Sequence, residues 1–205
     1  MTNEHSSILT KAIEAANGNL IQATFFQLGA SQAASRKAQH SERVSKKAEI
    51  EILKSFAENN HYWFKKIKQE NYIGEGAEQK VYLEDNGKYV LKINDAVFYA
   101  SWTDYFINLL IHNLLFPATA YQLLGFYQLE TAFYAVVKQP FIASTQPTDL
   151  LELRSFLQEN GFVCKKNNDY FHSELGIILE DLHDANVLTN QGVFFFIDNA
   201  IYLIP

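Results

Sequence analysis

Two glycines and one lysine near the middle of the sequence are residue types that bind phosphate. Gly74 and Gly76 precede an apolar run, and glycine lets backbone N–H groups approach phosphate oxygens closely. Lys92 lies between the apolar residues Leu91 and Ile93, where a buried ammonium needs a carboxylate or a phosphate unless it reaches solvent. A tight turn would explain the glycines alone, and a solvent-reaching side chain would explain the lysine alone.

Carboxylates and an amide are concentrated nearer the C-terminus. Residues 180–188 read Glu-Asp-Leu-His-Asp-Ala-Asn-Val-Leu and contain Asp181 and Asn186. Asp198 directly follows the apolar residues 194–197, so a strand is expected to carry its charge to water, a metal or a partner. These are hard oxygen ligands that suit Mg²⁺, which binds one or two carboxylates together with substrate phosphates. Because each feature also fits an ordinary loop or turn, their order along the chain matters more than any one of them.

This order resembles the protein-kinase-like superfamily, whose signature is a Gly-rich loop, a strand lysine, an H-R-D-x-x-x-x-N loop and D-F-G. The resemblance covers roughly residues 71–200. More narrowly, the sequence is similar to the small kinase-like domain of polyvalent proteins of phages and conjugative elements, a class of mobile genetic element. The narrower similarity lies in residues 112–117, 124–126, 138–142 and 180–188. The last of these is also similar to the loop of aminoglycoside phosphotransferases, which act on small molecules.

For the nucleotide, the resemblance implies that Gly74 and Gly76 cover the phosphates of ATP. It implies that Lys92 contacts the α- and β-phosphates and is one of the catalytic residues. Val81 is expected to line the adenine pocket together with Val90. The implied cofactors are therefore ATP and Mg²⁺.

For the chemistry, the resemblance implies that Asp181 orients or deprotonates the acceptor hydroxyl. Asn186 is expected to hold a metal, and Asp198 to bridge Mg²⁺ to the phosphates. His183 lies in the same loop, between Asp181 and Asn186. Phosphoryl transfer requires mainly positioning and charge neutralisation, so these few groups suffice in principle.

The sequence departs from the superfamily pattern at several positions. Gln79 replaces the third glycine of the loop. The His and Arg of H-R-D are Leu179 and Glu180, and the Phe and Gly of D-F-G are Asn199 and Ala200. Each replacement is individually tolerable.

The glutamate that usually pairs with the strand lysine is also missing. None occurs between Lys92 and Glu130, so the ion pair is absent or is supplied by Asp95 or Asp104. Only seven residues follow Asp198, so we expect no activation segment and no site for a large protein substrate within this sequence. The missing glutamate and the missing activation segment favour a catalytically inactive form.

Two hypotheses of function follow from this pattern. The first is ATP- and Mg²⁺-dependent phosphotransfer to a protein side chain or a small hydroxylated molecule. The second is a catalytically inactive kinase-like module that binds nucleotide or a protein, with the N-terminal helices recruiting the protein partner. Nucleotidyl transfer on the same scaffold stays open as a third reading.

The sequence changes character near residue 70. Residues 1–70 predict a helical N-terminal segment: a first helix that ends at Asn17, a short second helix, and a long amphipathic helix over residues 31–56. The sequence does not decide whether that long helix packs on the rest of the chain, on another copy or on a different protein. Residues 71–205 predict a compact kinase-like domain of α+β class, with an antiparallel sheet in the N-lobe and a reduced C-lobe.

The elements expected beyond residue 71 are short. Asn86-Gly87 between two apolar runs is a strong signal for a hairpin. The other expected elements are a helix over residues 102–115, strands over 120–127 and 132–137, a helix over 148–159 capped by Thr148 or Asp149, and apolar runs at 177–179 and 193–197.

Composition limits the class of protein. With 48% hydrophobic and 20% charged residues, the 205 residues suit one packed domain with or without an appendage, and the single cysteine excludes an intrachain disulfide. Residues 1–70 carry 10 Lys and Arg against 7 Asp and Glu, whereas residues 71–205 carry 7 against 16, so nucleic acid is not an expected partner. No apolar run reaches the roughly 20 residues of a membrane span, and no signal peptide is visible, so a cytoplasmic protein is expected.

Overall fold

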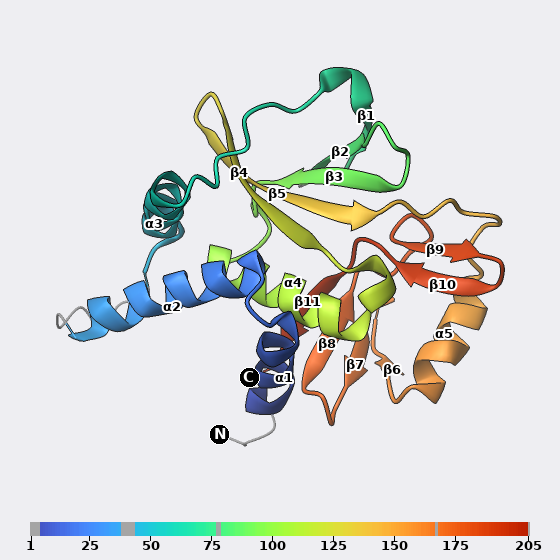
Figure 1. Ribbon diagram of the computed structural model, residues 1–205. Helices are drawn as coiled ribbons and strands as arrows, with labels where there is room; N and C mark the ends of the chain where they lie inside the picture. The colour runs from blue at the N-terminus through green and yellow to red at the C-terminus, as the bar shows by residue number, and fades with distance from the viewer. Residues whose placement is uncertain (1–4, 38–43, 77–78, 167, 205) are drawn as a thin grey trace. The chain divides into compact units, whose positions relative to one another are not determined.

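The computed structural model describes residues 5–37, 44–76, 79–166 and 168–204. The chain divides into two compact units (Figure 1). The five-stranded unit comprises residues 16–110 and 121–141, and the two-sheet unit comprises residues 1–15, 111–120 and 142–205. Helices and antiparallel sheets are both present, which confirms the predicted α+β class.

The chain begins with helices, and strands predominate after them. The helices are α1 (His5–Ala16), α2 (Leu20–Lys37), α3 (Lys46–Asn59), α4 (Trp102–Leu115) and α5 (Leu150–Glu159), with short 3-10 helices η1 (Gln69–Asn71) and η2 (Pro117–Thr119). The strands are β1 (Tyr72–Glu75), β2 (Gln79–Leu83), β3 (Tyr89–Asn94), β4 (Gln122–Leu129), β5 (Ala132–Pro140), β6 (Val163–Cys164), β7 (Tyr170–His172), β8 (Ile177–Glu180), β9 (Val187–Asn190), β10 (Val193–Phe196) and β11 (Ala200–Leu203).

The five-stranded sheet has the order β1-β2-β3-β5-β4, and every neighbouring pair is antiparallel. The predicted hairpin at Asn86-Gly87 joins β2 to β3. Gly87 has a φ of +65°, which glycine adopts without steric cost. The Asn86 side chain accepts a hydrogen bond from the Lys88 N–H at 2.8 Å, so the turn is fixed by its own residues.

The two faces of this sheet are covered by different segments. One face carries a core cluster of Ile67, Tyr82, Ile93 and Val136. The opposite face is covered by α4, which begins with Trp102. The Trp102 ring lies 5.2 Å from the ring of Phe133, and Phe106 lies 6.5 Å from Phe126.

The β4 edge of the sheet is joined to the segment that follows α3. The Phe126 N–H donates to the Tyr62 carbonyl at 2.8 Å, and the Phe64 N–H donates to the Phe126 carbonyl at 2.7 Å. This close approach requires Gly125, because an added Cβ there would lie 2.1 Å from the Tyr62 carbonyl oxygen.

The prediction of one long helix over residues 31–56 is wrong. The second helix continues past Gly29 to Lys37, and α3 starts anew at Lys46. Ser45 is extended and caps α3 by accepting a hydrogen bond from the Ala48 N–H at 3.3 Å. Residues 38–43 lie outside the described part of the chain. The helix α3 contacts α2 and β4, so its packing partner is this chain itself.

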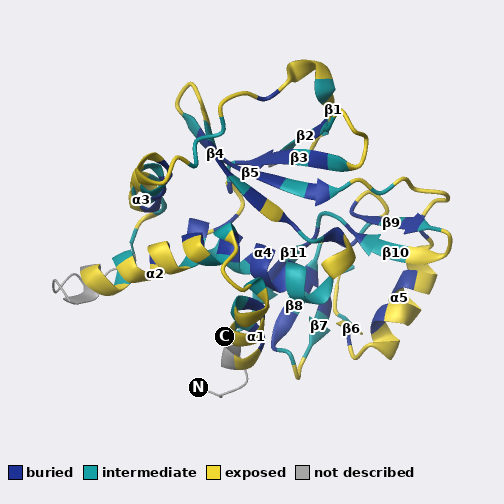
Figure 2. Ribbon diagram, viewed as in Figure 1, coloured by how far each residue is buried: buried dark blue, intermediate teal, exposed yellow. Residues whose placement is uncertain are grey.

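The two-sheet unit contains the four-stranded sheet β11-β8-β7-β6 and the β9–β10 hairpin. Asp149 caps α5 by accepting hydrogen bonds from the first backbone N–H groups, which confirms one of the two predicted caps. Thr148 instead donates to the Val187 carbonyl at 2.6 Å and ties α5 to β9. Leu153 and Leu157 form the buried side of α5, whose other side is exposed (Figure 2).

Candidate functional site

The structure aligns three of the predicted nucleotide-binding residues across the five-stranded sheet. Gly74 lies opposite Val81, and Val81 lies opposite Lys92. Directly opposite residues of antiparallel strands project from the same face, so these positions form one row on neighbouring strands. Val137 continues the row opposite Lys92. Val90 precedes Lys92 by two positions and therefore shares this face as well.

Lys92 does not reach solvent at an edge of the sheet. Its side chain belongs to the central strand β3 and the residue is only 3% exposed. The ammonium Nζ lies 5.5 Å from the centre of the Tyr121 ring, within the range of a cation–π interaction. A buried lysine on this face is placed to meet a ligand or an acidic group, as a phosphate-binding role requires.

The two glycines ahead of β2 have open space beside their backbone. The Gly76 N–H donates to the Gln79 carbonyl at 2.9 Å. A Cβ added at Gly74 or at Gly76 would meet no atom within 4 Å. The absence of side chains therefore exposes backbone that a phosphate can approach. Residues 77 and 78 of the predicted loop lie outside the described residues.

The two predicted substitutes for the missing glutamate stabilise backbone at the start of α4. Asp104 accepts a hydrogen bond from the Ser101 hydroxyl at 2.6 Å, and its own N–H donates to Ser101 Oγ at 3.0 Å. Ser101 Oγ therefore caps the first turn of α4 by accepting from the Asp104 N–H, and its hydroxyl is itself bound to the Asp104 carboxylate. Asp95 accepts from the Val97 N–H at 3.0 Å in the loop that precedes the helix.

In the two-sheet unit, three polar residues predicted for the chemistry lie at the ends of paired strands. Asp181 follows β8, Asn186 precedes β9 and Asp198 lies between β10 and β11. The antiparallel β9–β10 hairpin brings Asn186 and Asp198 to the same end, where the Ile197 N–H donates to the Asn186 carbonyl at 2.9 Å. Pairing of β11 with β8 brings the same turn close to Asp181, because Ala200 lies opposite Glu180.

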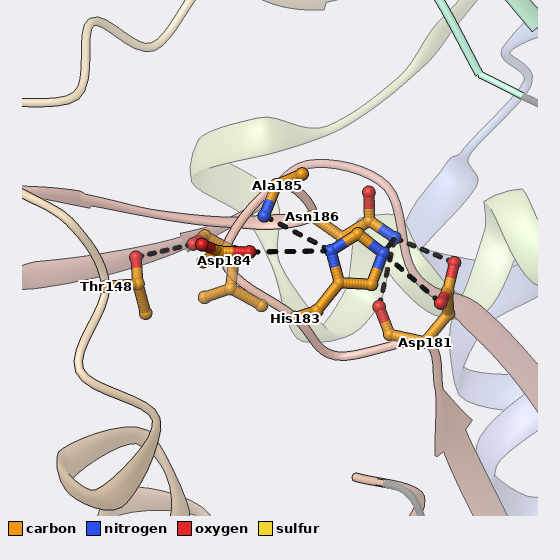
Figure 3. A network of polar contacts seen from close by, with 7 residues as sticks. Thr148, Asp181, His183, Asp184, Ala185 and Asn186 are labelled. Carbon is orange, nitrogen blue, oxygen red and sulfur yellow. Dashed lines mark hydrogen bonds and ion pairs between the residues drawn. The ribbon is translucent and has the colours of Figure 1, made fainter.

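The side chain of Asn186 is held in one orientation by its neighbours (Figure 3). Its amide NH₂ donates to Asp181 Oδ2 at 2.8 Å and to the Asp181 carbonyl at 3.0 Å. Within the described parts of the chain, no donor is hydrogen-bonded to its Oδ1. The oxygen, which is the atom a hard cation needs, is therefore left available.

His183 contributes to the same network through both ring nitrogens. The Ala185 N–H donates to Nδ1 at 3.2 Å, and the Asn186 side-chain nitrogen lies 3.1 Å from Nε2. Nε2 lies 3.3 Å from Asp181 Oδ1. His183 and Asn186 thus contact different oxygens of the Asp181 carboxylate and orient it from two sides.

Asp181 has an unusual backbone conformation and an open side chain. Its φ is +63°, a left-handed value that aspartate tolerates better than most residues. Its side chain is 65% exposed despite the contacts from Asn186 and His183. The carboxylate is therefore both oriented and accessible to an acceptor hydroxyl.

Glu180 stands where the H-R-D motif has arginine. Partial burial raises the pKa of its carboxyl, and the nearby carboxylates of Asp169 and Asp181 raise it further. The substitution therefore adds negative charge beside Asp181 where the superfamily pattern has positive charge. A cation bound nearby would offset this repulsion.

Sequence reasoning missed a buried polar network in the two-sheet unit. His112 is fully buried, with Nδ1 3.1 Å from Asn199 Oδ1 and Nε2 3.1 Å from the Thr119 carbonyl. Thr119 Oγ1 donates to the Phe196 carbonyl at 2.6 Å. The network thus links α4 and η2 to the turn that carries Asp198. A histidine on an otherwise apolar helical stripe was the only sequence signal for it.

The donor set of the two-sheet unit fits a magnesium ion. Asp181, Asn186 and Asp198 offer carboxylate and amide oxygens, and the Asn186 contacts leave Oδ1 available. Among the described residues, no group of three or more His, Cys, Asp or Glu side chains is arranged so that it could hold a metal ion by itself. Magnesium does not need such a cluster, because it keeps several water ligands and shares substrate phosphates.

Comparison with known protein families matches residues 46–205 to a family described as the serine/threonine/tyrosine kinase found in polyvalent proteins. The chain belongs to this family. Membership in the polyvalent-protein kinase family confirms the similarity predicted from the sequence and the kinase-like fold. It supports phosphotransfer as the general activity, with the nucleotide and divalent metal that kinases use.

The region matched to the polyvalent-protein kinase family starts at Lys46, the first residue of α3, and so includes this helix. No curated protein matches this chain. Across the residues that the structure describes, no helix is long and apolar enough to span a membrane.

Proposed function

We propose that this polyvalent-protein kinase transfers the terminal phosphoryl group of ATP, with Mg²⁺, to a hydroxyl group. The observation that carries the proposal is the arrangement of Asp181 and Asn186 in the two-sheet unit. Asn186 orients the Asp181 carboxylate through its NH₂ group and keeps its own oxygen for a cation. Asp198 supplies the second metal-binding side chain from the same end of the β9–β10 hairpin.

The five-stranded unit would hold the nucleotide. Gly74 and Gly76 offer open backbone to the phosphates, and Lys92 offers a buried ammonium for the α- and β-phosphates. Val81 and Val90 lie on the same face and would contact the adenine ring. Bound Mg²⁺ would supply neutralisation of the phosphate charge.

Asp181 would act on the acceptor. Its exposed carboxylate can accept a hydrogen bond from an incoming hydroxyl and take its proton as the new bond to phosphorus forms. His183 and Asn186 would hold the carboxylate in the orientation that this contact requires. The family description names serine, threonine and tyrosine kinases, so a protein hydroxyl is the favoured acceptor and a small hydroxylated molecule is the alternative.

A second candidate is a catalytically inactive module that binds nucleotide or a protein partner. The observation that favours it is the helix α4, which covers the Lys92 face without any glutamate. In kinases the ion pair between the strand lysine and a helix glutamate is part of the active arrangement. Under this second candidate, the N-terminal helices would present the partner-binding surface.

Incubation of the purified protein with γ-labelled ATP and Mg²⁺ separates these candidates. We expect label on a serine, threonine or tyrosine of the protein or of an added protein acceptor, and its loss in Asp181→Asn. The exposed carboxylate of Glu174 provides a matched control, and Glu174→Gln should keep the activity. Mass spectrometry of the product distinguishes phosphoryl from nucleotidyl transfer. Binding of Mg²⁺–ATP without any transfer would instead favour the inactive module.

A further inference from the structure

The buried carboxylate of Glu49 joins α3 to the first turn of α4. Glu49 is 0% exposed. Its two oxygens accept hydrogen bonds from the Trp102 N–H and the Thr103 hydroxyl, both at 2.7 Å. The first N–H groups of a helix lack partners within the helix and carry partial positive charge, so a carboxylate is a suitable partner there.

Lys46 holds the loop that leads into the same helix. Its Nζ donates to the Ala96 carbonyl and, at 2.9 Å, to the Tyr99 carbonyl. Ala96 has a φ of +57°, an uncommon conformation for a residue with a Cβ. The Asn94 side chain supports this bend by accepting from the Ala96 N–H at 2.6 Å. Lys46 thus stabilises a strained loop by binding two of its carbonyl groups.

Lys46 and Glu49 act on one connection from one side of α3. They are three positions apart, which places them on the same helical face. The connection starts at β3, which carries Lys92, and ends at α4. The helix α4 covers the face of the sheet from which Lys92 projects, because Trp102 packs on Phe133. Its position therefore bears on the surroundings of the Lys92 ammonium.

We propose that α3 is an internal clamp that sets the nucleotide site of the five-stranded unit. Lys46 and Glu49 are positioning residues: they fix the β3–α4 connection and the start of α4, and through them the environment of Lys92. The role in nucleotide binding rests on the proposed function, whereas the clamp itself is a property of the fold. A carboxylate buried at this site costs free energy unless it is fully hydrogen-bonded, and both of its oxygens are.

Matched variants of α3 test the clamp. Glu49→Ala and Lys46→Met remove the two contacts, and the exposed neighbours Glu51→Ala and Lys47→Met serve as controls on the same helix. Glu49→Gln is the conservative variant, because its amide can still accept from the Trp102 N–H and donate to Thr103 Oγ1. The measurements are amide hydrogen exchange by mass spectrometry, without nucleotide, and Mg²⁺–ATP affinity by calorimetry.

We expect Glu49→Ala and Lys46→Met to remain folded. In each variant, amide hydrogen exchange in residues 94–106 should become about tenfold faster and the affinity for Mg²⁺–ATP should fall about tenfold. The Mg²⁺–ATP affinity of Glu49→Gln should lie within about threefold of that of the starting protein. The two control variants should have the same affinity as the starting protein. Unchanged affinity together with faster exchange spread over the whole chain would show a purely structural role and overturn the proposal. Folded starting protein that binds no Mg²⁺–ATP would overturn the proposed function, while the exchange comparison would still decide whether the clamp exists.

Discussion

The side-chain amide of Asn186 donates a hydrogen bond to Asp181 Oδ2 at 2.8 Å. This contact fixes both partners: the carboxylate is oriented, and the amide oxygen is turned away from it and left for a cation. Under the proposed function, this pair connects the carboxylate that acts on the acceptor with an oxygen that binds the metal. Loss of either side chain should therefore disturb both the acceptor chemistry and the metal binding.

Replacing Asn186 by alanine should remove the hydrogen bonds to Asp181 and the candidate metal ligand together. We expect a loss in unfolding free energy of about 1–3 kcal/mol and a marked loss of Mg²⁺-dependent nucleotide affinity. Asn186→Asp keeps an oxygen ligand but places a second carboxylate beside Asp181, so its stability should fall as the pH rises and should recover when Mg²⁺ is added. Denaturant unfolding with and without Mg²⁺ measures both effects. Equal behaviour of the two variants would contradict the assigned geometry.

Gly74→Ala should weaken nucleotide binding without affecting the fold. Its added Cβ meets no atom within 4 Å, so the change in unfolding free energy should stay within about 0.5 kcal/mol. The methyl group would occupy space that a phosphate needs. Calorimetric titration with Mg²⁺–ATP, alongside thermal unfolding, checks both halves of this prediction. Full affinity in a stable variant would remove Gly74 from the site.

Gly125→Ala should be strongly destabilising for the opposite reason. Its φ is +143°, and the new Cβ would lie 2.1 Å from the Tyr62 carbonyl oxygen. We expect the unfolding free energy, measured by denaturant unfolding, to fall by about 3 kcal/mol or more. Gly29→Ala is the matched control, because Gly29 lies within α2 and its Cβ would meet nothing within 4 Å. The unfolding free energy of this control variant should rise by up to about 1 kcal/mol.

Glu180 should make the protein less stable as the pH rises through a window above the ordinary glutamate pKa of 4.5. Burial raises the pKa of Glu180 in the folded state, so within that window the folded protein binds more protons than the unfolded chain. The folded state is therefore favoured at the acidic end, and this advantage is lost as the pH rises through the raised pKa. Glu180→Gln removes the effect, so its stability relative to the starting protein should improve with rising pH. Denaturant unfolding at several acidic pH values measures the unfolding free energy of both proteins. The prediction is contradicted if the unfolding free energies of the starting protein and of Glu180→Gln change with pH in parallel.

The sequence predicted elements whose signals are local. The β2–β3 hairpin depends on Asn86-Gly87, and the helix α4 follows from its apolar spacing and the proline after it. The break between α2 and α3 was missed, because residues on both sides of it favour helix and the cap at Ser45 is a weak signal. Strands such as β6 and β7 were missed because two or three residues cannot show a period.

The candidate site was predicted only where its residues give a local signal in the sequence. Asp181, Asn186 and Asp198 stand out by type and order, and the structure brings these three together through strand pairing. The clamp by Glu49 was not foreseeable, because its partner Trp102 lies far along the chain and only tertiary packing joins them. The contacts of His183 needed coordinates too, since the sequence does not say which groups its two ring nitrogens meet. The predicted domain boundary at residue 70 and the roles of the individual site residues remain predictions.

The most direct test of the central claim is calorimetric titration of the purified protein with ATP, in the presence and absence of Mg²⁺. Lys92→Ala and Asp198→Asn should be titrated in parallel, after their fold has been checked by circular dichroism. We predict saturable binding that requires Mg²⁺ and is abolished by either substitution. Unchanged Mg²⁺–ATP affinity in the folded variants, or no binding by the folded starting protein, would contradict the nucleotide site.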